Sequence, residues 1–259
     1  MNAPRRAAVI VALLGASLPG MSLPGSLASA APPPLQELRF GTTADYPPFA
    51  LHDAAGRLTG ADIEAARRIA ARLGLRAQFV PTTWTTLAAD LRAGRFDVLL
   101  GGITVTPERA ALGRYSIVLL RDGKRPLVRC EDRDRYTTPA SIDRGDVRVM
   151  INRGPGMPAV AQRLFPNAAL TVNRDDATLI PFLLERRVDV WITDGVVVDH
   201  MARRHAGQLC AARVAPYAGT EVEKAWLIRG DAALLQRLDV ELSAELASGR
   251  WQRDLEAVP

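Results

Sequence analysis

Two hydrophobic patterns alternate along the chain after residue 37. Short apolar runs at Leu38–Thr43 and Leu75–Val80 predict strands. Between them, apolar residues recur three or four positions apart over Ala61–Leu73, which predicts a helix ending at Gly74. Strands that alternate with helices across short loops predict a parallel sheet covered by helices.

The same alternation continues and then restarts. The first unit is completed by a helix over Thr85–Ala93, a strand over Phe96–Leu100, a short helix from Pro107 and a strand over Tyr115–Leu120, after which Arg121–Lys124 turns away. The second unit has expected strands at Leu127–Cys130, Val147–Ile151, Ala168–Val172 and Val188–Ile192, and helices that end near Phe165, Arg186 and His205. Asp175 or Asp176 is expected to cap the middle helix, and the strand-like Lys224–Ile228 and the amphipathic Ala232–Ser248 and Trp251–Leu255 finish the chain. The pattern therefore predicts an α/β protein of two units, each with a glycine-rich turn at a strand end.

Composition agrees with two small lobes or one large domain of 259 residues. The net charge of +5 falls by two, to +3, when Arg5 and Arg6 of the N-terminal leader are set aside. This mild and evenly interspersed charge argues against nucleic acid as a partner, and weakly favours an anionic small ligand.

The N-terminus has the features of an export signal. Arg5 and Arg6 precede the apolar run Ala7–Leu14, and Ala28-Ser29-Ala30 offers a cleavage site. We expect residues 1–30 to be removed on secretion to the periplasm; an uncleaved anchor is the alternative. No later stretch is long and apolar enough to cross a membrane.

Cys130 and Cys210 are the two cysteines of the chain. In an exported protein such a pair predicts one disulfide, and two buried thiols are the alternative.

Arg109 is the first candidate for ligand binding. The predicted strand Phe96–Leu100 ends in Gly101-Gly102, and Thr104 follows with further donors. A guanidinium beside exposed amides at a strand end suits a carboxylate, whereas the alternative is an ordinary surface arginine.

An aromatic wall is the second candidate. Asp45-Tyr46-Pro47-Pro48-Phe49 forms a rigid loop at the end of another predicted strand. Its two rings either line a pocket or fill the core.

These residues together resemble the family 3 periplasmic solute-binding proteins. The marks are Asp45–Phe49, Gly60-x-Asp62, Phe96-Asp97, Gly102–Arg109, Asp189 and Asp194. The resemblance implies two lobes joined by two crossing strands, with a ligand in the cleft between them and delivery to an ABC permease. It divides the chain into lobe 1, residues 31–125 with 214–259, and lobe 2, residues 126–213.

The resemblance also implies roles for individual residues. Arg109 is expected to bind the ligand α-carboxylate, and Asp194 an α-ammonium if the ligand has one. Asp62, Asp97 and Asp189 are expected to be structural. The full set of expected ligand-binding residues is Asp45, Tyr46, Phe49, Trp84, Gly102, Thr104, Arg109, Lys124, Asn152, Asp194, Glu223 and Lys224.

Within this superfamily the chain is similar to the cyclohexadienyl dehydratases, which act on prephenate and arogenate. Pro81–Trp84, Leu120–Lys124 and Glu223–Ala225 carry this likeness, and both cysteines match it. One departure is serious: the glutamate that is the expected general acid of these enzymes falls at Pro158, and a carboxylate-binding threonine falls at Gly156. Loss of a positioned acid typically costs roughly 10² to 10⁴ in rate.

Three functions therefore stand open. A binding protein for an amino-acid-like or carboxylate ligand is favoured, a prephenate or arogenate dehydratase is the alternative, and a purely structural role is the third. No nucleotide, hydrolase or dinucleotide motif is present, so no cofactor is expected. His200 and His205, five positions apart on a predicted helix, are expected to be solvated, and no metal site is expected.

Overall fold

Two five-stranded sheets organise the part of the chain that the computed structural model describes, namely residues 36–152, 157–173, 178–230 and 232–258. In spatial order the first sheet contains β5 (Arg76–Pro81), β1 (Glu37–Thr42), β6 (Val98–Leu99), β15 (Leu227–Ile228) and β7 (Arg114–Tyr115). The second contains β11 (Ala169–Asn173), β10 (Arg148–Asn152), β12 (Val190–Asp194), β9 (Lys124–Arg129) and β13 (Leu209–Ala211). Three strands in each sheet pair in parallel, and the remaining pairs are antiparallel.

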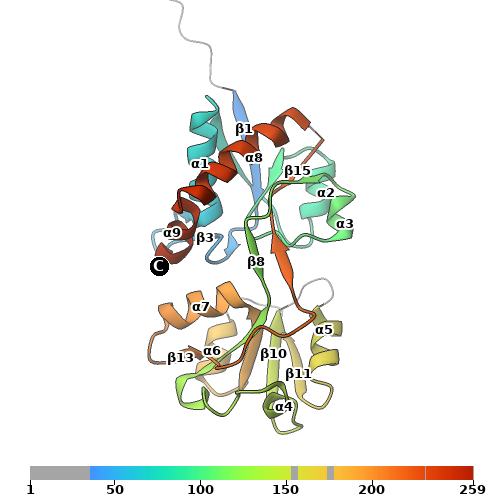
Figure 1. The fold of residues 1–259 in the computed structure, drawn as a ribbon, viewed down its shortest axis with the longest axis vertical. Helices are drawn as coiled ribbons and strands as arrows, with labels where there is room; N and C mark the ends of the chain where they lie inside the picture. Colours follow the sequence, from blue (N-terminus) through green and yellow to red (C-terminus); the bar gives the residue numbers. More distant parts are fainter. Residues whose placement is uncertain (1–35, 153–156, 174–177, 231, 259) are drawn as a thin grey trace, which may run out of the picture. The chain divides into compact units, whose positions relative to one another are not determined.

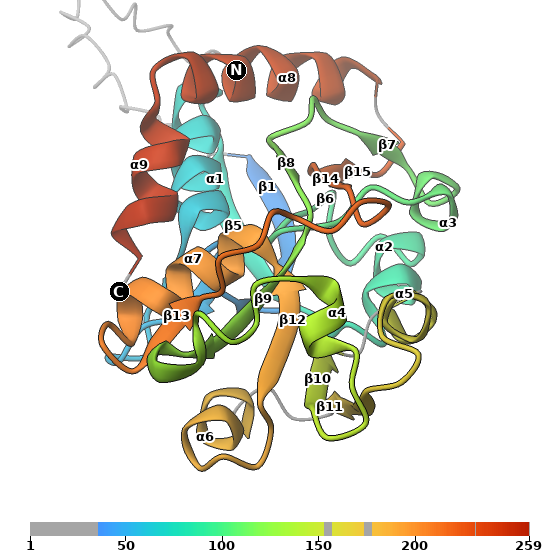
Figure 2. The same ribbon diagram turned by 60° about the horizontal axis from the view of Figure 1, so that its bottom comes forward.

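Helices accompany each sheet (Figures 1 and 2). With the first sheet lie α1 (Ala61–Arg72), α2 (Leu87–Arg92), α3 (Pro107–Ala110), α8 (Ala232–Ala247) and α9 (Arg250–Ala257). With the second lie the 3₁₀ turn η1 (Cys130–Asp132), α4 (Pro139–Ile142), α5 (Met157–Leu164), α6 (Leu179–Leu184) and α7 (Gly195–Arg204). We call these two assemblies the first lobe and the second lobe. The two-lobed α/β fold predicted from the sequence is confirmed.

The amphipathic pattern of α1 explains how the first lobe closes. Ile63, Ala66 and Ile69 are fully buried, and the helix packs against α8 and α9. Burial of such side chains stabilises the fold by roughly 1.5–3 kcal/mol for each large aliphatic group. Residues from the C-terminal end of the chain therefore complete the core that the N-terminal strands begin (Figure 1).

Two antiparallel strands, β8 (Leu120–Asp122) and β14 (Val222–Lys224), cross between the lobes (Figure 1). β8 passes through Gly123 directly into β9, so the predicted turn over Arg121–Lys124 is wrong. Gly123 packs against Pro216, and a Cβ at Gly123 would lie 2.9 Å from the Pro216 ring. The segment is extended because both of its ends are held in ladders.

The predicted strand over Tyr115–Leu120 is also wrong, since it is split between β7 and β8. The Ser116 hydroxyl accepts from the backbone N–H of Trp226, and the N–H of Ile117 donates to Asp239 at 2.8 Å. These hydrogen bonds to side chains interrupt the predicted strand between Tyr115 and Leu120. The expected strand Lys224–Ile228 divides in the same way, into the ends of β14 and β15.

A three-stranded sheet of β2 (Asp45–Tyr46), β3 (Ala50–His52) and β4 (Leu58–Thr59) follows β1. Asp53 and Gly56 in the sequence predict a hairpin over residues 51–60, and the antiparallel pair of β3 and β4 confirms it. β13 and α4 are further elements that the pattern did not indicate. The expected caps Asp175 and Asp176, and the leader of residues 1–30, lie outside the described residues.

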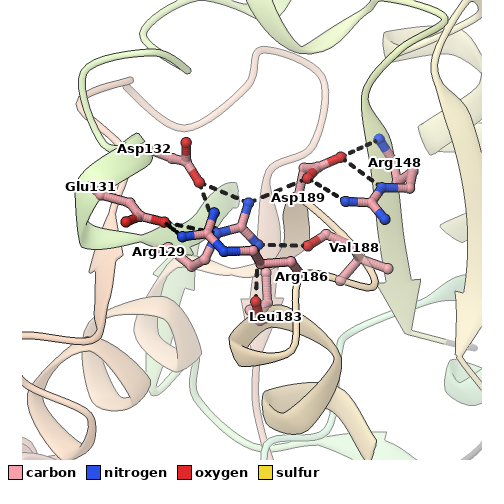
Figure 3. Close-up of polar contacts among 8 residues, drawn as sticks. All are labelled: Arg129, Glu131, Asp132, Arg148, Leu183, Arg186, Val188 and Asp189. Atoms are coloured by element: carbon pink, nitrogen blue, oxygen red, sulfur yellow. Dashed lines mark hydrogen bonds and ion pairs between the residues drawn. The ribbon is translucent and has the colours of Figure 1, made fainter.

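A disulfide between Cys130 and Cys210 joins the end of β9 to β13, as predicted. Beside it, the buried guanidinium of Arg129 donates to the carbonyls of Leu183 and Val188 and pairs with Asp132 and Asp189 (Figure 3). Asp189 also accepts from Arg148 at 2.8 Å. Asp189 is thus structural, as expected.

Candidate functional site

A cavity of about 250 Å³ lies where residues from both lobes and from the crossing strands meet. This volume lies just below the range of typical ligand pockets, roughly 300–1,000 Å³, so it suits a small molecule of amino-acid size. The lining residues are Tyr46, Trp84, Gly102, Thr104, Thr106, Arg109, Lys124, Asn152, Met157, Val160, Ile192, Thr193, Asp194, Gly219, Thr220, Glu221, Val222 and Lys224.

The Gly101-Gly102 turn is held from behind by Asp62. One carboxylate oxygen of Asp62 accepts from the N–H groups of both glycines, at 2.9 and 3.0 Å, and the other accepts from the indole of Trp251. Burial raises the pKa of Asp62, and these hydrogen bonds oppose that shift. Asp62 is therefore structural, as expected, and it fixes the turn that forms one wall of the cavity.

Arg109 projects from α3 and lies half-buried at the cavity. Thr106 caps this short helix by accepting from the backbone N–H of Arg109, and Pro107 occupies its first position. The guanidinium donates to the carbonyl of Thr104 at 3.0 Å, and burial lowers the pKa of Arg109. Within the described ranges, no carboxylate forms an ion pair with it. The site therefore contains a partly desolvated cation with room for an anionic partner.

Asp194 lies on the opposite side, at the junction of β12 and α7. Its carboxylate is 2% exposed and accepts from the ammonium of Lys224 at 2.7 Å, from the ammonium of Lys124 and from the hydroxyl of Tyr46. Burial alone would raise the pKa of Asp194, but the two ammonium groups outweigh it and hold that pKa well below its ordinary value. Burial also lowers the pKa of Lys224, against the opposing effect of Asp194.

Lys224 links the two polar parts of the cavity. Its ammonium donates to the Thr104 hydroxyl at 2.9 Å, while the Thr104 carbonyl accepts from Arg109. The same ammonium lies 5.1 Å from the centre of the Tyr46 ring, within the range of a cation–π contact. Arg109 and the Lys–Asp cluster are thus separated by a single bridging residue.

The rest of the lining is largely apolar. Trp84 packs edge-on against Tyr46 and donates its indole N–H to Asp45 at 2.9 Å. Met157, Val160 and Ile192 line the side contributed by the second lobe. The cavity therefore offers a cationic region for a ligand's head and an apolar region for its body.

Nine of the twelve expected ligand-binding residues line this cavity: Tyr46, Trp84, Gly102, Thr104, Arg109, Lys124, Asn152, Asp194 and Lys224. Asp45, Phe49 and Glu223 do not. Phe49 is fully buried and stacks on Tyr46 at 5.5 Å, so it fills the core behind the wall. Asp45 lies outside the cavity, where it accepts a hydrogen bond from the indole of Trp84. Glu223 forms an ion pair with the exposed Arg121 at 3.0 Å.

Sequence reasoning missed the segment 219–222, which lines the cavity next to Lys224. Its single acid, Glu221, is exposed, and the backbone N–H groups of Glu221 itself and Gly219 lower its pKa. Thr220 accepts from the backbone N–H of Lys124 at 2.9 Å, which ties this segment to the start of β9. The sequence contained a signal for this segment, because it directly precedes Glu223 and Lys224, which are both expected to bind the ligand.

Pro158 lies exposed in the first turn of α5 and is not among the residues that line the cavity, whereas Gly156 lies outside the described residues. The prediction that His200 and His205 are both solvated is wrong for His200, which lies on α7 and is only 1% exposed. His200 faces inward because Val197 and Val198 on the same helix are buried in the core beside it.

In the parts of the chain that can be described, no cluster of histidine, cysteine or carboxylate side chains has the arrangement of a metal site. No helix in those ranges has both the length and the hydrophobicity needed to span a bilayer.

Comparisons with known proteins identify similar sequences and a similar fold. The profile of the bacterial extracellular solute-binding proteins, family 3, matches residues 38–256. Cyclohexadienyl dehydratase of Pseudomonas aeruginosa is 32% identical over 220 residues, covering 85% of this chain and 81% of that protein. The ABC transporter arginine-binding protein 1 of Escherichia coli is 26% identical over 84% of this chain and 88% of its own. A solved ancestral cationic amino acid solute-binding protein superposes with a TM-score of 0.75 at 29% identity, over 86% of this chain and 95% of its own.

Proposed function

Because the chain belongs to family 3 of the bacterial extracellular solute-binding proteins, we propose that its cavity binds a small carboxylate ligand for uptake. The family's extracellular description supports a periplasmic location, with residues 1–30 as a cleaved signal peptide. The relative that is named as an ABC transporter binding protein supports delivery to an ABC permease.

Arg109 is the observation that carries this proposal. A guanidinium that is partly removed from water needs an anionic partner, and none of the described side chains supplies one. Thr104 lies beside it, so a carboxylate there can accept from the planar guanidinium and from the Thr104 hydroxyl. The N–H groups of Gly101 and Gly102 are taken by Asp62, so the turn shapes this wall without binding the carboxylate. The nine lining residues are the proposed contacts.

Lobe movement is part of the proposal. We place the lobe boundaries at residues 31–125 with 214–259, and at residues 126–213. Only β8 and β14, with their continuations, join the two sheets in this scheme, and such short crossings suit a hinge.

The test is calorimetry of the purified mature protein with amino acids and 2-oxo acids, alongside Arg109→Ala. Truncation should weaken binding roughly 30- to 1,000-fold, since removing one partner of a buried charge pair costs about 2–4 kcal/mol. Arg114→Ala is the matched control, because Arg114 is exposed and outside the cavity. Equal affinity of Arg109→Ala and the wild type for every bound carboxylate would remove the proposal.

Dehydration of prephenate or arogenate is the second candidate, favoured by the 32% identity to cyclohexadienyl dehydratase. Chemistry opposes it. Pro158 cannot donate a proton, and the pKa values of both carboxyls that line the cavity, Asp194 and Glu221, are lowered, so both are ionised at neutral pH. Incubation with prephenate should therefore give no phenylpyruvate. Turnover that is lost in Arg109→Ala would instead establish the enzyme.

A further inference from the structure

We infer that the cavity selects carboxylates whose α-substituent is an oxo or hydroxyl oxygen over α-amino acids. This inference rests on the proposed carboxylate site at Arg109 and specifies what binds next to it. It concerns Asp194 and the two lysines that form ion pairs with its carboxylate. The family resemblance implies that Asp194 binds the α-ammonium of a ligand.

Asp194 is already fully engaged. One of its oxygens accepts from Lys124, and the other accepts from Lys224 and Tyr46. The carboxylate is 2% exposed and the side chains of Lys224 and Lys124 are 3% and 14% exposed, so water does little to screen this cluster. An incoming ammonium would have to displace one lysine from Asp194.

Lys224 cannot withdraw easily to make room. It lies on β14, where its backbone pairs with Leu120, and a bridge also joins it to Thr104. Its ammonium is held between Asp194, the Thr104 hydroxyl and the face of Tyr46. A lysine ammonium has three N–H donors, and Asp194 and Thr104 account for two. The third can serve an oxygen of the ligand.

The bridge through Thr104 sets the geometry. Arg109 and Lys224 both contact Thr104, so a ligand whose carboxylate pairs with Arg109 can present its α-substituent to the Lys224 ammonium. An oxo or hydroxyl oxygen at the α-carbon accepts a hydrogen bond from Lys224. An α-ammonium would instead be repelled by the ammonium groups of Lys124 and Lys224. Water screens this repulsion poorly in the cavity, so it opposes the binding of amino acids.

Charge balance supports the same conclusion. Arg109, Lys124 and Lys224 contribute three positive charges to the lining, and Asp194 and the exposed Glu221 contribute two negative charges. A ligand carboxylate offsets the remaining positive charge, whereas the ammonium of an amino acid restores it.

The test uses matched probes that differ only at the α-position. Phenylalanine, phenylpyruvate and phenyllactate form one series, and leucine, 4-methyl-2-oxopentanoate and 2-hydroxy-4-methylpentanoate form another. Their apolar bodies suit the wall of Trp84, Met157 and Val160. Calorimetry should give a dissociation constant at least tenfold lower for the oxo or hydroxy acid than for the amino acid of each series.

Lys224→Met should reduce this preference at least tenfold, because it removes one of the two ammonium groups that pair with Asp194 and leaves only the Tyr46 hydroxyl on that oxygen. A ligand ammonium can then pair with the carboxylate. Lys124→Met is a second variant at a less buried position, and thermal melts establish that each protein is folded. Arg121→Met is the control, since it removes an exposed positive charge from β8 and should leave the preference unchanged.

The outcomes separate the two proposals. If wild-type protein binds an amino acid more tightly than its oxo and hydroxy counterparts, the inference is overturned and the carboxylate site stands. An unchanged preference in both lysine variants overturns the inference as well. If no carboxylate binds at all, the proposed function fails and the inference with it.

Discussion

At the scale of single residues, the partners of a charged side chain separate structural arginines from Arg109. Arg39 pairs with Asp97 at 2.6 Å, and Arg129 pairs with Asp132 and Asp189. Both stabilise the ends of strands. Arg109 has a backbone carbonyl as its partner instead, and that contrast is the basis of the proposed function.

His200 gives a prediction about acid stability. Its Nε2 atom is buried without a hydrogen-bond partner in the described structure, and burial lowers the pKa of His200 to about 4, helped by Arg203 and Arg204. The ordinary value is about 6.5, so below that pH the unfolded chain binds a proton that the folded chain does not. Stability should therefore fall as the pH drops from about 6.5 to about 4, by roughly 3 kcal/mol.

Urea unfolding at several pH values measures this loss. His200→Phe should flatten the part of the profile that lies between pH 6.5 and 4, whereas His52→Phe, at an exposed position, should not. A His200→Phe profile that keeps the wild-type slope would assign the acid sensitivity to other groups.

Residue identity alone could not place every side chain. From the sequence, the aromatic rings of the loop could either line a pocket or fill the core. In the structure each alternative holds for one ring: Tyr46 lines the cavity and Phe49 fills the core. Likewise, residue type does not distinguish His200 from a solvated histidine. Its burial depends on the packing of α7 against β9, β12 and β13.

At the scale of elements, the turn after β6 depends on missing Cβ atoms. Gly102 has φ +71°, and a Cβ there would lie 2.5 Å from Phe49 and 2.7 Å from Tyr46. Gly102→Ala should therefore displace the Tyr46 ring, lower stability by about 2–4 kcal/mol and weaken ligand binding. Thermal unfolding and calorimetry measure the two effects.

Gly74→Ala is the matched control. Gly74 has φ +69°, but no atom lies within 4 Å of the position that a Cβ would take there, so only the backbone cost of about 1 kcal/mol applies. Equal destabilisation of the two variants would mean that the contact with Tyr46 and Phe49 is not what requires glycine at this turn.

Hydrophobic periodicity correctly predicted elements such as α1, β1 and β10, whose structure follows from their own residues. It failed where hydrogen bonds to residues far away in the sequence determine the local structure. Ser116 and Ile117 leave the ladder because Trp226 and Asp239, more than 100 positions away, supply their hydrogen bonds. The extended course of Gly123 depends in the same way on β14 and Pro216.

At the scale of the whole molecule, the proposed hinge predicts compaction on ligand binding. A ligand that contacts Arg109 of the first lobe and Met157 and Val160 of the second joins both lobes, so it favours their closed arrangement. Small-angle X-ray scattering should show a smaller radius of gyration with a bound oxo acid. Arg109→Ala at the same ligand concentration should show no change, and compaction in that variant would mean that closure does not depend on the proposed site.

The cavity illustrates what the chain as a whole determines. The sequence indicates Lys124, Asp194 and Lys224 one by one, but it does not predict their convergence into one ion-paired cluster. They come from β9, β12 and β14, and only the crossing of β8 and β14 between the sheets brings them together. The inference that Asp194 does not receive a ligand ammonium depends on this cluster.

The position of β15 also has a consequence for how the protein is made. This strand, Leu227–Ile228, lies between β6 and β7, which are synthesised more than 100 residues earlier. Until the ribosome has passed residue 228, β7 has no neighbour in its sheet, and the first lobe cannot reach its final structure. Contacts so distant in sequence slow folding. The nascent chain therefore remains incompletely folded for most of its synthesis, which is the condition that threading an unfolded chain through a membrane requires.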